Sequence, residues 1–317
     1  MLVSHHMKIL WILPGSKDDK QNMIFAKRAI PALVETGIIV DEFYLESRSS
    51  LIYLLKSWLQ VRKVIREQRY DALHAQYGSV LGFFTWSLLH PYFVTLRGSD
   101  FNGDPAVSIL RRGIAKILSY WVAFRSLNVF CVSDDIAKRI IVPSVVLPSP
   151  TDLQIFRPIS VSEARNKLEI KTSNLLVGFA GGARSLKRRD LARKACELAG
   201  LELLEIQNVT PEEMPLWLNA CDILIFTSEK EGSPNVIREA MACGLPIASV
   251  NVGDVRKWVD RDPYSKVVDA TPEALASALK QIQAKLPKRE RRTSLEELAP
   301  FNYAKKLREI YLSQKKR

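Results

Sequence analysis

The sequence contains no long hydrophobic run. No apolar stretch in its 317 residues reaches the roughly eighteen residues that a membrane-spanning helix needs. The hydrophobic share of 47% and the charged share of 25% are those of a soluble globular protein. The opening MLVSHH lacks the basic region followed by an apolar one that marks a signal peptide, so we interpret residues 1–6 as an extension or a cloning remnant. We therefore expect a cytoplasmic protein without a transmembrane helix.

Cysteine and histidine are also scarce. The four cysteines are far apart and form no CxxC pair: Cys131, Cys196, Cys221 and Cys243. This spacing argues against a zinc site and a disulfide framework, and it fits a reducing compartment. After the opening segment only His74 and His90 remain, and we interpret His74 as a strand residue rather than an acid–base group.

Two common nucleotide-binding motifs are missing as well. The chain has neither the GK[ST] of a Walker loop nor a GxGxxG fingerprint. Asp260 and Asp262 form a DxD in the polar turn VDRDPYS, but no nucleotide-binding pattern stands beside them. We therefore expect neither a metal site nor a cofactor.

Positive charge is abundant and unevenly placed. Of the formal net charge of +12, residues 285–317 contribute +7. Such a basic segment can bind nucleic acid or an anionic membrane, or it can simply be solvated, and composition leaves these alternatives open. A nucleic-acid-binding protein would account for the charge, although the basic residues are not interleaved with aromatic ones in a known binding motif.

Strand-like runs alternate with segments of helical period along the whole chain, which is the pattern of a parallel sheet covered by helices. In the first half, strands are expected at 8–13, 38–45, 72–77, 92–96, 127–133 and 144–148. In the second half, they are expected at 175–180, 201–206, 222–227 and 246–251. Four prolines between positions 143 and 158 separate the two sets. The sequence therefore predicts two doubly wound α/β domains joined by a hinge.

The segment DILIFTSEKEGSPNVIREAMACGLPIASV has the pattern of strand, loop, helix and strand. Ser233 suits a helix N-cap, Pro234 suits the first helical position, and Gly244 suits the left-handed residue that ends a helix. These signals predict a helix over 234–242. Its N-terminus should lie at the carboxyl edge of the sheet, where open α/β sheets bind ligands.

Two glutamates bracket this helix start. Glu231 precedes it, and Glu239 lies about 9 Å along the helix axis from Ser233, with a side chain that leans back toward the N-terminus. The backbone N–H groups of Asn235 and Val236 attract phosphate. Ionised carboxylates accept strong hydrogen bonds from hydroxyls, so a diphosphate between two hydroxyl-rich rings would satisfy all of these groups. The spacing therefore predicts a nucleotide diphospho-sugar.

A second candidate site is the segment GFAGGARSLKRRD at 178–190. Gly181 and Gly182 let the backbone approach a ligand closely. Arg184 and Lys187 supply positive charge to a leaving diphosphate without a metal.

With these residues, the chain resembles the retaining glycosyltransferases of family four, which have the two-domain GT-B fold. The similarity is most specific over 222–253, where EGSPNVIREAMACGLPIASVNVGDV looks like the family's donor motif of a Glu, seven residues and a second Glu. The segments YDALHAQYG, TLRGSD and VSDDIAKRI and the proline-rich hinge resemble further family signatures, so the similarity covers most of the chain.

The resemblance implies a domain plan. An N-terminal, acceptor-binding Rossmann-like domain would span 1–155, and a C-terminal, nucleotide-sugar-binding one would span 156–300, with a cleft between them. Family members have a final helix that crosses back to the first domain, and here that helix would be 301–317. The apolar face of Tyr303, Leu307, Ile310 and Tyr311 is consistent with such docking.

The resemblance also implies roles for individual positions. Glu231 would lie by the transferred sugar, Glu239 would bind the donor ribose, and Lys187 with Arg184 would neutralise the leaving diphosphate. The other donor-binding positions would be Gly181, Gly182, Ser233, Pro234, Asn235 and Val236. The acceptor would contact Gly15, Ser16, Arg97 and Asp100. Arg97 stands where the family often has a histidine, and the N-terminal glycine-rich loop is reduced to PGS.

We therefore expect a metal-independent, retaining hexosyltransferase that moves a sugar from a nucleotide diphospho-sugar to an acceptor hydroxyl, in the synthesis of a cell-envelope polysaccharide or glycolipid. The alternatives are a sugar-nucleotide epimerase of the same fold and a basic nucleic-acid-binding protein. The apolar segment 80–89 and the mixed apolar and basic segment 107–124 fit two interpretations. They are either ordinary core helices or a peripheral contact with a membrane that carries a lipid-linked acceptor.

Overall fold

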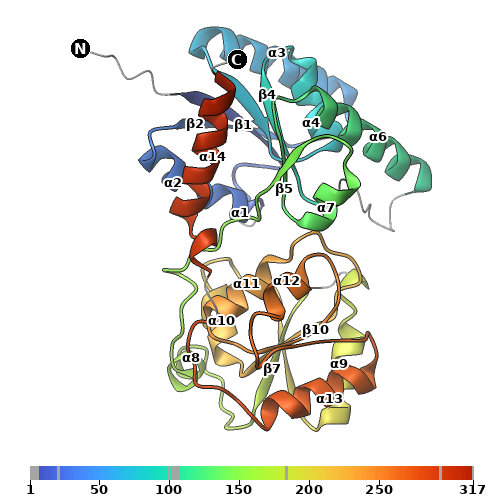
Figure 1. Ribbon diagram of the computed structural model, residues 1–317, viewed down its shortest axis with the longest axis vertical. Coiled ribbons are helices and arrows are strands. Elements are labelled where there is room, and N and C mark those ends of the chain that lie inside the picture. Colours follow the sequence, from blue (N-terminus) through green and yellow to red (C-terminus); the bar gives the residue numbers. More distant parts are fainter. Residues whose placement is uncertain are drawn as a thin grey trace. The chain divides into compact units, whose positions relative to one another are not determined.

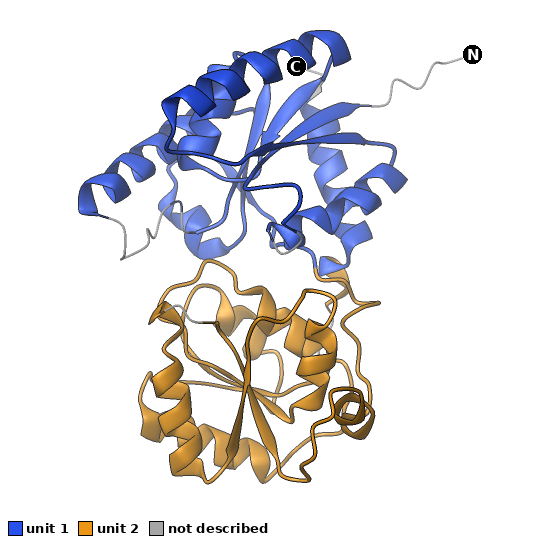
Figure 2. Cartoon of the chain, turned by 180° about the vertical axis from the view of Figure 1, so that it is seen from behind, with its two compact units in different colours: residues 1–150, 298–317 blue, residues 151–297 orange. Residues whose placement is uncertain are grey.

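The computed structural model describes residues 7–19, 22–98, 100, 108–182, 185–292 and 295–315. The chain divides into two compact units (Figure 2). Unit 1 comprises residues 1–150 and 298–317, and unit 2 comprises residues 151–297. These limits lie close to the boundaries expected from the proline-rich hinge, and each unit is described below by itself.

Unit 1 is built on a six-stranded parallel sheet of order β2-β1-β3-β4-β5-β6. Its strands are β1 (Lys8–Pro14), β2 (Ile39–Leu45), β3 (Ala72–Ala75), β4 (Tyr92–Leu96), β5 (Val129–Cys131) and β6 (Ser144–Val146). Each overlaps a strand expected from the sequence. The chain moves from β1 to β2 on one side and then returns to β3 on the other, so the topological switch point lies between the carboxyl ends of β1 and β3.

Two sets of helices cover the two faces of this sheet (Figure 1). The first set is α3 (Leu51–Gln68), α4 (Ser79–Ser87), α6 (Ile109–Arg125) and α7 (Asp134–Arg139). The second set is α1 (Ile24–Lys27), α2 (Ala29–Glu35) and α14 (Pro300–Lys315). Alternate strand residues serve the two layers, since Leu10 and Ile12 of β1 face the first set while Ile9 and Trp11 face the second.

The closing helix α14 packs on unit 1 through one buried face. Tyr303, Leu307 and Tyr311 join the same core cluster as Trp11 and Phe93. The Trp11 indole N–H donates to the Tyr311 hydroxyl at 3.2 Å, and that hydroxyl also hydrogen-bonds His74 Nδ1. The last helix is therefore held by both apolar burial and a buried polar network.

Unit 2 has a five-stranded parallel sheet of order β11-β10-β9-β7-β8. Its strands are β7 (Leu176–Ala180), β8 (Glu202–Ile206), β9 (Ile223–Phe226), β10 (Ile247–Val250) and β11 (Lys266–Val268). Its helices are α8 (Val161–Lys167), α9 (Arg189–Ala199), α10 (Met214–Ala220), α11 (Asn235–Ala242), α12 (Val255–Val259) and α13 (Pro272–Gln283). The helices α9 and α13 bury Ala192, Ala195, Leu275 and Leu279 against β7, β9 and β10. Two doubly wound parallel α/β units confirm the predicted fold class.

Among the described residues, no helix is long and apolar enough to cross a membrane. All four cysteines are free and buried. Burial raises the pKa of the Cys131 thiol to about 11. These side chains therefore act as small packing residues in the two units.

Candidate functional site

The candidate site in unit 2 lies at the carboxyl ends of β7 and β9. These strands are neighbours although β8 separates them in the chain, so the switch point of the sheet falls between them. β7 leads into Gly181 and Gly182, and β9 leads into the loop 227–234 that precedes α11. The parallel sheet therefore brings both segments selected from the sequence to one edge.

The helix start at α11 differs in detail from the expectation. The helix begins at Asn235, and Pro234 is the N-cap, with φ −71° and ψ 115°. Ser233 does not cap the helix because its hydroxyl donates to Asp254 Oδ2 at 2.7 Å and accepts from the Arg238 guanidinium. The predicted roles of Ser233 as N-cap and Pro234 as first helical residue were therefore wrong by one position. Within the described residues, no side-chain capping hydrogen bond is made at this N-terminus.

The far end of α11 follows the prediction. The helix ends at Ala242, and Gly244 has φ +80°. A Cβ at Gly244 would lie 2.6 Å from the backbone oxygen of Glu290, so glycine is required there by both conformation and space.

Lys187 and Glu231 form an ion pair at this edge. The Lys187 ammonium donates to Glu231 Oε1 at 2.7 Å, and the two side chains are 22% and 20% exposed. Partial exposure leaves both groups accessible to a ligand while burial strengthens their interaction. The structure thus brings together two of the three side chains to which catalytic roles were assigned. The third, Arg184, lies outside the described residues.

The loops that carry this pair are joined by hydrogen bonds that the sequence did not reveal. The Arg188 guanidinium donates to the backbone oxygen of Thr227 at 2.6 Å, and the Thr227 hydroxyl donates to the backbone oxygen of Lys187 at 2.7 Å. The Glu229 N–H donates to Leu186 O at 2.8 Å. Arg188 therefore holds the Lys187 segment against the end of β9.

Glu239 lies one turn beyond Asn235 on α11. Asn235, Val236 and Glu239 are partly exposed, whereas Ile237, Arg238 and the residues from Ala240 to Ala242 are buried. Residues 235, 236 and 239 share one face of a helix. The expected ribose-binding carboxylate therefore shares the accessible face of α11 with the expected phosphate-binding residues.

A buried polar cluster lies under this face and was missed by sequence reasoning. The Arg238 guanidinium is fully buried and lies 3.9 Å from the Asp254 carboxylate, which also accepts from the Trp258 indole at 2.9 Å. A second Arg238 nitrogen donates to Asn235 Oδ1 at 2.6 Å. Burial lowers the pKa of Arg238, and the Asp254 charge opposes this shift. Arg238 therefore positions both Ser233 and Asn235.

Two glycines allow close contacts around the Glu231 loop. A Cβ at Gly181 would lie 2.4 Å from the Phe179 ring and 3.0 Å from Lys187 Cβ, so a larger residue would displace Lys187. Gly253 has φ +56°, and a Cβ there would lie 2.7 Å from Gly232 O and 3.0 Å from Glu231 O. Gly182 also has a positive φ, of +59°. The VGDV segment is thus a close neighbour of the loop that holds Glu231.

The expected acceptor residues of unit 1 fall into two groups. Gly15 follows β1 with φ +87°, its N–H donates to Leu45 O at 3.0 Å, and Asn22 fills the space beside it. Ser16 accepts from the N–H of Asp18 at 3.3 Å. This turn leaves the carboxyl end of β1, at the switch point of the sheet.

Arg97 and Asp100 form the second group and are mutually hydrogen-bonded. Asp100 Oδ1 accepts from the Arg97 N–H at 2.9 Å, and Oδ2 accepts from the Gly78 N–H at 2.8 Å. The Arg97 guanidinium donates to Gln76 Oε1 at 2.6 Å and to Ser149 Oγ at 3.0 Å. Burial raises the pKa of Asp100, an effect that the Gly78 N–H opposes. Both side chains therefore brace the ends of β3 and β4.

Gln76 is a further polar residue at this edge. Its Nε2 is buried and has no hydrogen-bond partner within the described parts of the chain. It lies in the segment HAQYG, which resembles a family signature. A buried donor of this kind is suited to a ligand hydroxyl.

This chain is similar in sequence and in fold to known proteins. The family described as "Glycosyl transferases group 1" matches residues 160–285. A D-inositol 3-phosphate glycosyltransferase from Thermobispora bispora is 30% identical over 115 residues, which are 35% of this chain and 27% of that protein. The chain thus aligns with about a quarter of the length of this curated relative.

Solved structures of similar fold extend over nearly the whole chain. The sucrose-phosphate synthase from Thermosynechococcus elongatus superposes with a TM-score of 0.77 at 16% identity, covering 97% of this chain and 98% of that one. Anabaena Alr3699/HepE, in complex with UDP and glucose, superposes with a TM-score of 0.72 at 17% identity, covering 97% and 100%. Residues 160–285 therefore match the group 1 glycosyl transferase family, in a chain that has the GT-B fold and resembles glycosyltransferase family four.

Proposed function

We propose that the chain transfers a sugar from a nucleotide diphospho-sugar to an acceptor hydroxyl, with retention of anomeric configuration. The observation that carries this proposal is the Lys187–Glu231 ion pair at the switch point of unit 2, in the same sheet edge as the uncapped start of α11. A cation and a helix N-terminus suit a diphosphate, and a carboxylate suits sugar hydroxyls. The Anabaena protein of the same fold binds UDP and glucose, which supports this ligand class.

Each donor group has a proposed partner. The diphosphate contacts the backbone from Ser233 to Val236, beside the glycine turn at Gly181 and Gly182. Glu239 accepts hydrogen bonds from the ribose hydroxyls, and Glu231 orients the transferred sugar. Because a helix N-terminus carries a partial positive charge, α11 stabilises the diphosphate most when its negative charge grows as it leaves.

The proposed reaction has one bond exchange. The bond between the anomeric carbon and the diphosphate oxygen breaks, and a bond from that carbon to the acceptor oxygen forms on the same face. The acceptor proton passes to the leaving phosphate. Lys187 and Arg184 neutralise the departing diphosphate, so the step needs no side-chain nucleophile and no metal.

Unit 1 is proposed to hold the acceptor at the carboxyl edge of its sheet. Gly15 and Ser16 form the turn after β1, while Arg97 and Asp100 keep the neighbouring strand ends in place. The buried Gln76 Nε2 is an available donor. An acceptor with sugar hydroxyls, free or attached to a lipid, fits these groups, and we propose a role in cell-envelope polysaccharide or glycolipid synthesis.

The test is ligand-dependent thermal unfolding. UDP, GDP, ADP and CDP are added separately, with EDTA, to the wild type, to Glu239→Ala and to the control Glu273→Ala on α13 of the same unit. A ligand that binds only the folded state raises the midpoint by mass action. One nucleotide should stabilise the wild type and the control but not Glu239→Ala. Stabilisation by none of the four, with all proteins folded, would contradict the donor site.

Product analysis separates the alternatives. The protein is incubated, without an acceptor, with sugar nucleotides that carry the nucleoside diphosphate found to stabilise it. An epimerase converts one sugar nucleotide into another under these conditions, whereas a transferase does not. A salt-dependent shift of DNA or RNA mobility, with no nucleotide effect on unfolding, would instead support the nucleic-acid-binding alternative.

A further inference from the structure

The outward face of α6 in unit 1 is apolar. Leu110, Ile114, Ile117, Trp121 and Phe124 follow one another at intervals of four and three residues, so they form one stripe along the helix. Their exposed fractions range from 48% to 74%. The opposite face carries the buried Ser119, Val122 and Ala123. A surface helix normally presents polar residues outward, so this stripe calls for a covering partner.

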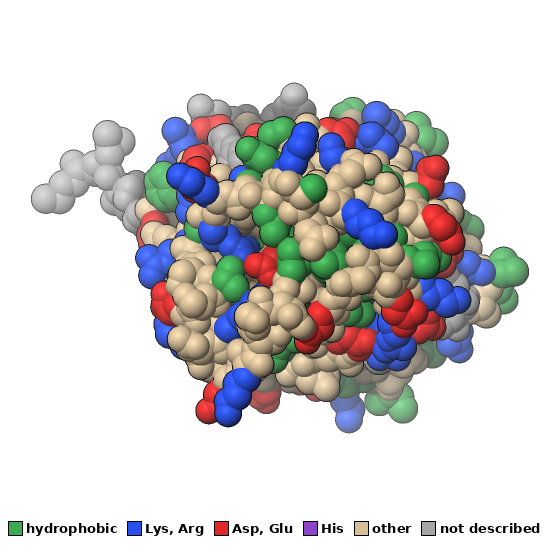
Figure 3. All heavy atoms as spheres, turned by 90° about the horizontal axis from the view of Figure 1, so that it is seen from below, with side chains coloured by type: hydrophobic (Ala, Val, Ile, Leu, Met, Phe, Trp, Pro, Cys, Tyr) green, Lys and Arg blue, Asp and Glu red, His purple; other side chains and the backbone are tan. Residues whose placement is uncertain are grey.

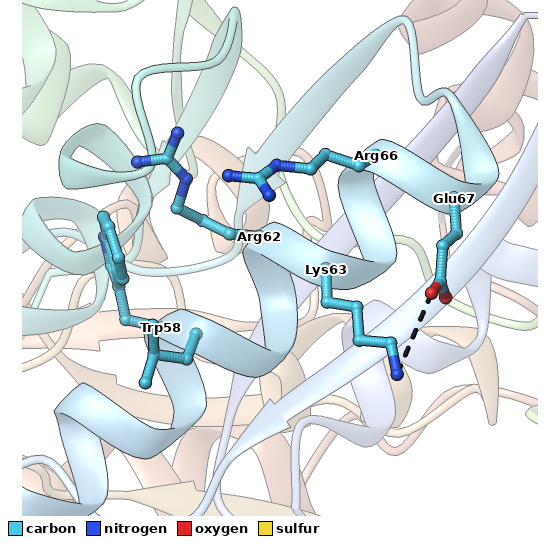
Figure 4. A pocket seen from close by; sticks show the side chains of 6 residues that line it. Trp58, Arg62, Lys63, Arg66 and Glu67 are labelled. Carbon is cyan, nitrogen blue, oxygen red and sulfur yellow. Dashed lines mark ion pairs between the residues drawn. The ribbon is translucent and has the colours of Figure 1, made fainter.

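The outward face of α3 changes from apolar to basic along its length. Leu51, Leu55 and Leu59 are 81%, 61% and 58% exposed, and Arg62 and Arg66 continue the same face toward the C-terminus. Figure 4 shows the Arg62 and Arg66 guanidinium groups on one side of α3, whereas Lys63 pairs with Glu67 on the other. No carboxylate in the described part of the chain forms an ion pair with either arginine.

These two helix faces belong to one continuous surface. An apolar hollow of about 340 Å³ is lined by residues of both α3 and α4, including Leu55, Trp58 and Phe83. From there, Phe83 contacts Trp86 at 5.1 Å between ring centroids, and Trp86 contacts Trp121 of α6 at 5.7 Å. The helices α3, α4 and α6 cover the same side of the sheet (Figure 1). We call the combined surface the apolar–basic face.

The charge of this face is mainly positive. Residues 51–66 and 109–125 contain no acidic residue and eight basic ones: Lys56, Arg62, Lys63, Arg66, Arg111, Arg112, Lys116 and Arg125. A second hollow, of about 480 Å³, is lined by Trp58, Arg62, Lys63, Arg66 and Glu67 and shares Trp58 with the apolar one. The Arg62 guanidinium stacks 4.7 Å from the Trp58 ring. On the side of the molecule drawn in Figure 3, by contrast, basic and acidic side chains are interspersed.

We propose that the apolar–basic face binds the surface of an anionic lipid bilayer. Exposed leucine, phenylalanine and tryptophan side chains insert at the boundary between headgroups and acyl chains, and the flanking arginines and lysines contact lipid phosphates. This geometry is that of helices lying in the plane of the membrane surface, in agreement with the finding that no described helix can span a membrane.

Charge favours a bilayer over a second copy of this chain. In a two-fold dimer the same patch meets itself, so Arg62 and Arg66 would face basic residues of the other copy. Anionic lipids supply the opposite charge, and their acyl chains supply the apolar contact. The inference does not depend on glycosyl transfer, because lipid binding is measured without substrate.

Co-sedimentation with vesicles tests the proposal. The vesicles are phosphatidylcholine alone or phosphatidylcholine with about one third phosphatidylglycerol, at low and at physiological salt. The wild type should bind the anionic vesicles at least about tenfold more strongly than the neutral ones, and added salt should weaken binding.

Two pairs of double variants locate the binding surface. Arg62→Glu with Arg66→Glu removes charge from the face, and Lys194→Glu with Lys280→Glu makes the same charge change on exposed helix positions of unit 2. Ile117→Ser with Phe124→Ser removes apolar contact, and Leu198→Ser with Leu286→Ser is its control. Both test variants should lose at least about tenfold in binding, and both controls should retain most of it.

The proposal is overturned if the wild type ignores anionic vesicles, or if the test variants bind as the controls do, since the basic residues after 285 would then explain binding. It is also overturned if the wild type is a dimer in solution that Ile117→Ser with Phe124→Ser makes monomeric. Circular dichroism and thermal midpoints verify that every variant is folded.

Discussion

The Lys187 ammonium lies 2.7 Å from the Glu231 carboxylate although the two residues are 44 positions apart in the chain. Strand order explains this proximity, because β7 and β9 are adjacent and both residues follow the carboxyl ends of these strands. Each residue sits on a loop that Arg188 and Thr227 join to the other. The ion pair is therefore part of a cross-linked edge of the sheet and not a chance surface contact.

Lys187 and Glu231 should act together in catalysis, so the effects of replacing them on kcat should not be additive. We expect Lys187→Ala to lower kcat about 10²- to 10³-fold, because a positive group facing the departing diphosphate is lost. Lys187→Arg keeps the charge and should restore part of the rate. The double variant Lys187→Ala with Glu231→Gln should lower kcat by less than the product of the two separate fold-changes, because both residues act on one step. Initial rates of sugar transfer measure this, with Lys194→Ala on α9 as control; a Lys187→Ala rate within about twofold of the wild type would contradict it.

Asp254 should be essential for the stability of unit 2. Replacing it by Ala leaves the fully buried Arg238 without its counter-charge and removes the acceptor of Ser233 and Trp258. Breaking a buried charge pair costs about 3–5 kcal/mol in the free energy of unfolding. Arg256→Ala disrupts the neighbouring exposed pair with Asp260 and should cost less than about 1 kcal/mol. Urea unfolding measures the free energy of unfolding of both variants. Equal losses for Asp254→Ala and Arg256→Ala would show that the buried cluster around Arg238 does not stabilise the unit.

Replacing Gly253 and Gly113 by alanine should change the free energy of unfolding in opposite directions. Gly253 has φ +56°, and an added Cβ would lie 2.7 Å from Gly232 O, so Gly253→Ala should destabilise by about 1–3 kcal/mol and displace the Glu231 loop. Gly113 lies within α6 with nothing within 4 Å of an added Cβ, so Gly113→Ala should stabilise by up to about 1 kcal/mol. Thermal unfolding gives both values, and the Michaelis constant for the donor should rise only for Gly253→Ala. A stabilising Gly253→Ala would refute the proposed close contact.

His74 should make unit 1 sensitive to acid. It is fully buried, bonded to Tyr311 and Thr95, and burial with the Arg97 charge nearby lowers its pKa well below 6.5. The unfolded chain therefore takes up a proton that the folded chain does not. This contribution to stability is fully present above pH 6.5 and is lost as the pH falls below that value, by at most about 1.4 kcal/mol per pH unit.

Urea unfolding at a series of pH values measures this loss. The wild type should lose stability more steeply below pH 6.5 than His74→Gln, which has no proton to take up at this position. His90 is present in both proteins, so it does not affect the comparison. Parallel pH profiles would show that His74 is not the acid-sensitive group.

The α11 segment and all strands except β11 (Lys266–Val268), where none was expected, were predictable because their signals are local. Hydrophobic runs predicted all six strands of unit 1. Gly244 indicated the end of α11 and the prolines around 150 indicated the boundary between the units, because both residue types restrict the backbone locally. The wrong N-cap at Ser233 shows the limit of such reasoning. A capping hydroxyl competes with other acceptors, and here Asp254, distant in sequence, takes the Ser233 hydroxyl.

The pattern of the sequence by itself determined two doubly wound α/β units, their order along the chain, and the loop that carries Glu231 into α11, because periodicity and turn chemistry depend on neighbouring residues. Only the tertiary structure decided that Lys187 meets Glu231, that Arg238 is buried against Asp254, and that α14 packs on β1 through Trp11. These pairings follow from strand order and from the return of the last helix. These contacts have no local signal in the sequence, because they join residues that are far apart in the chain and that no periodic pattern relates.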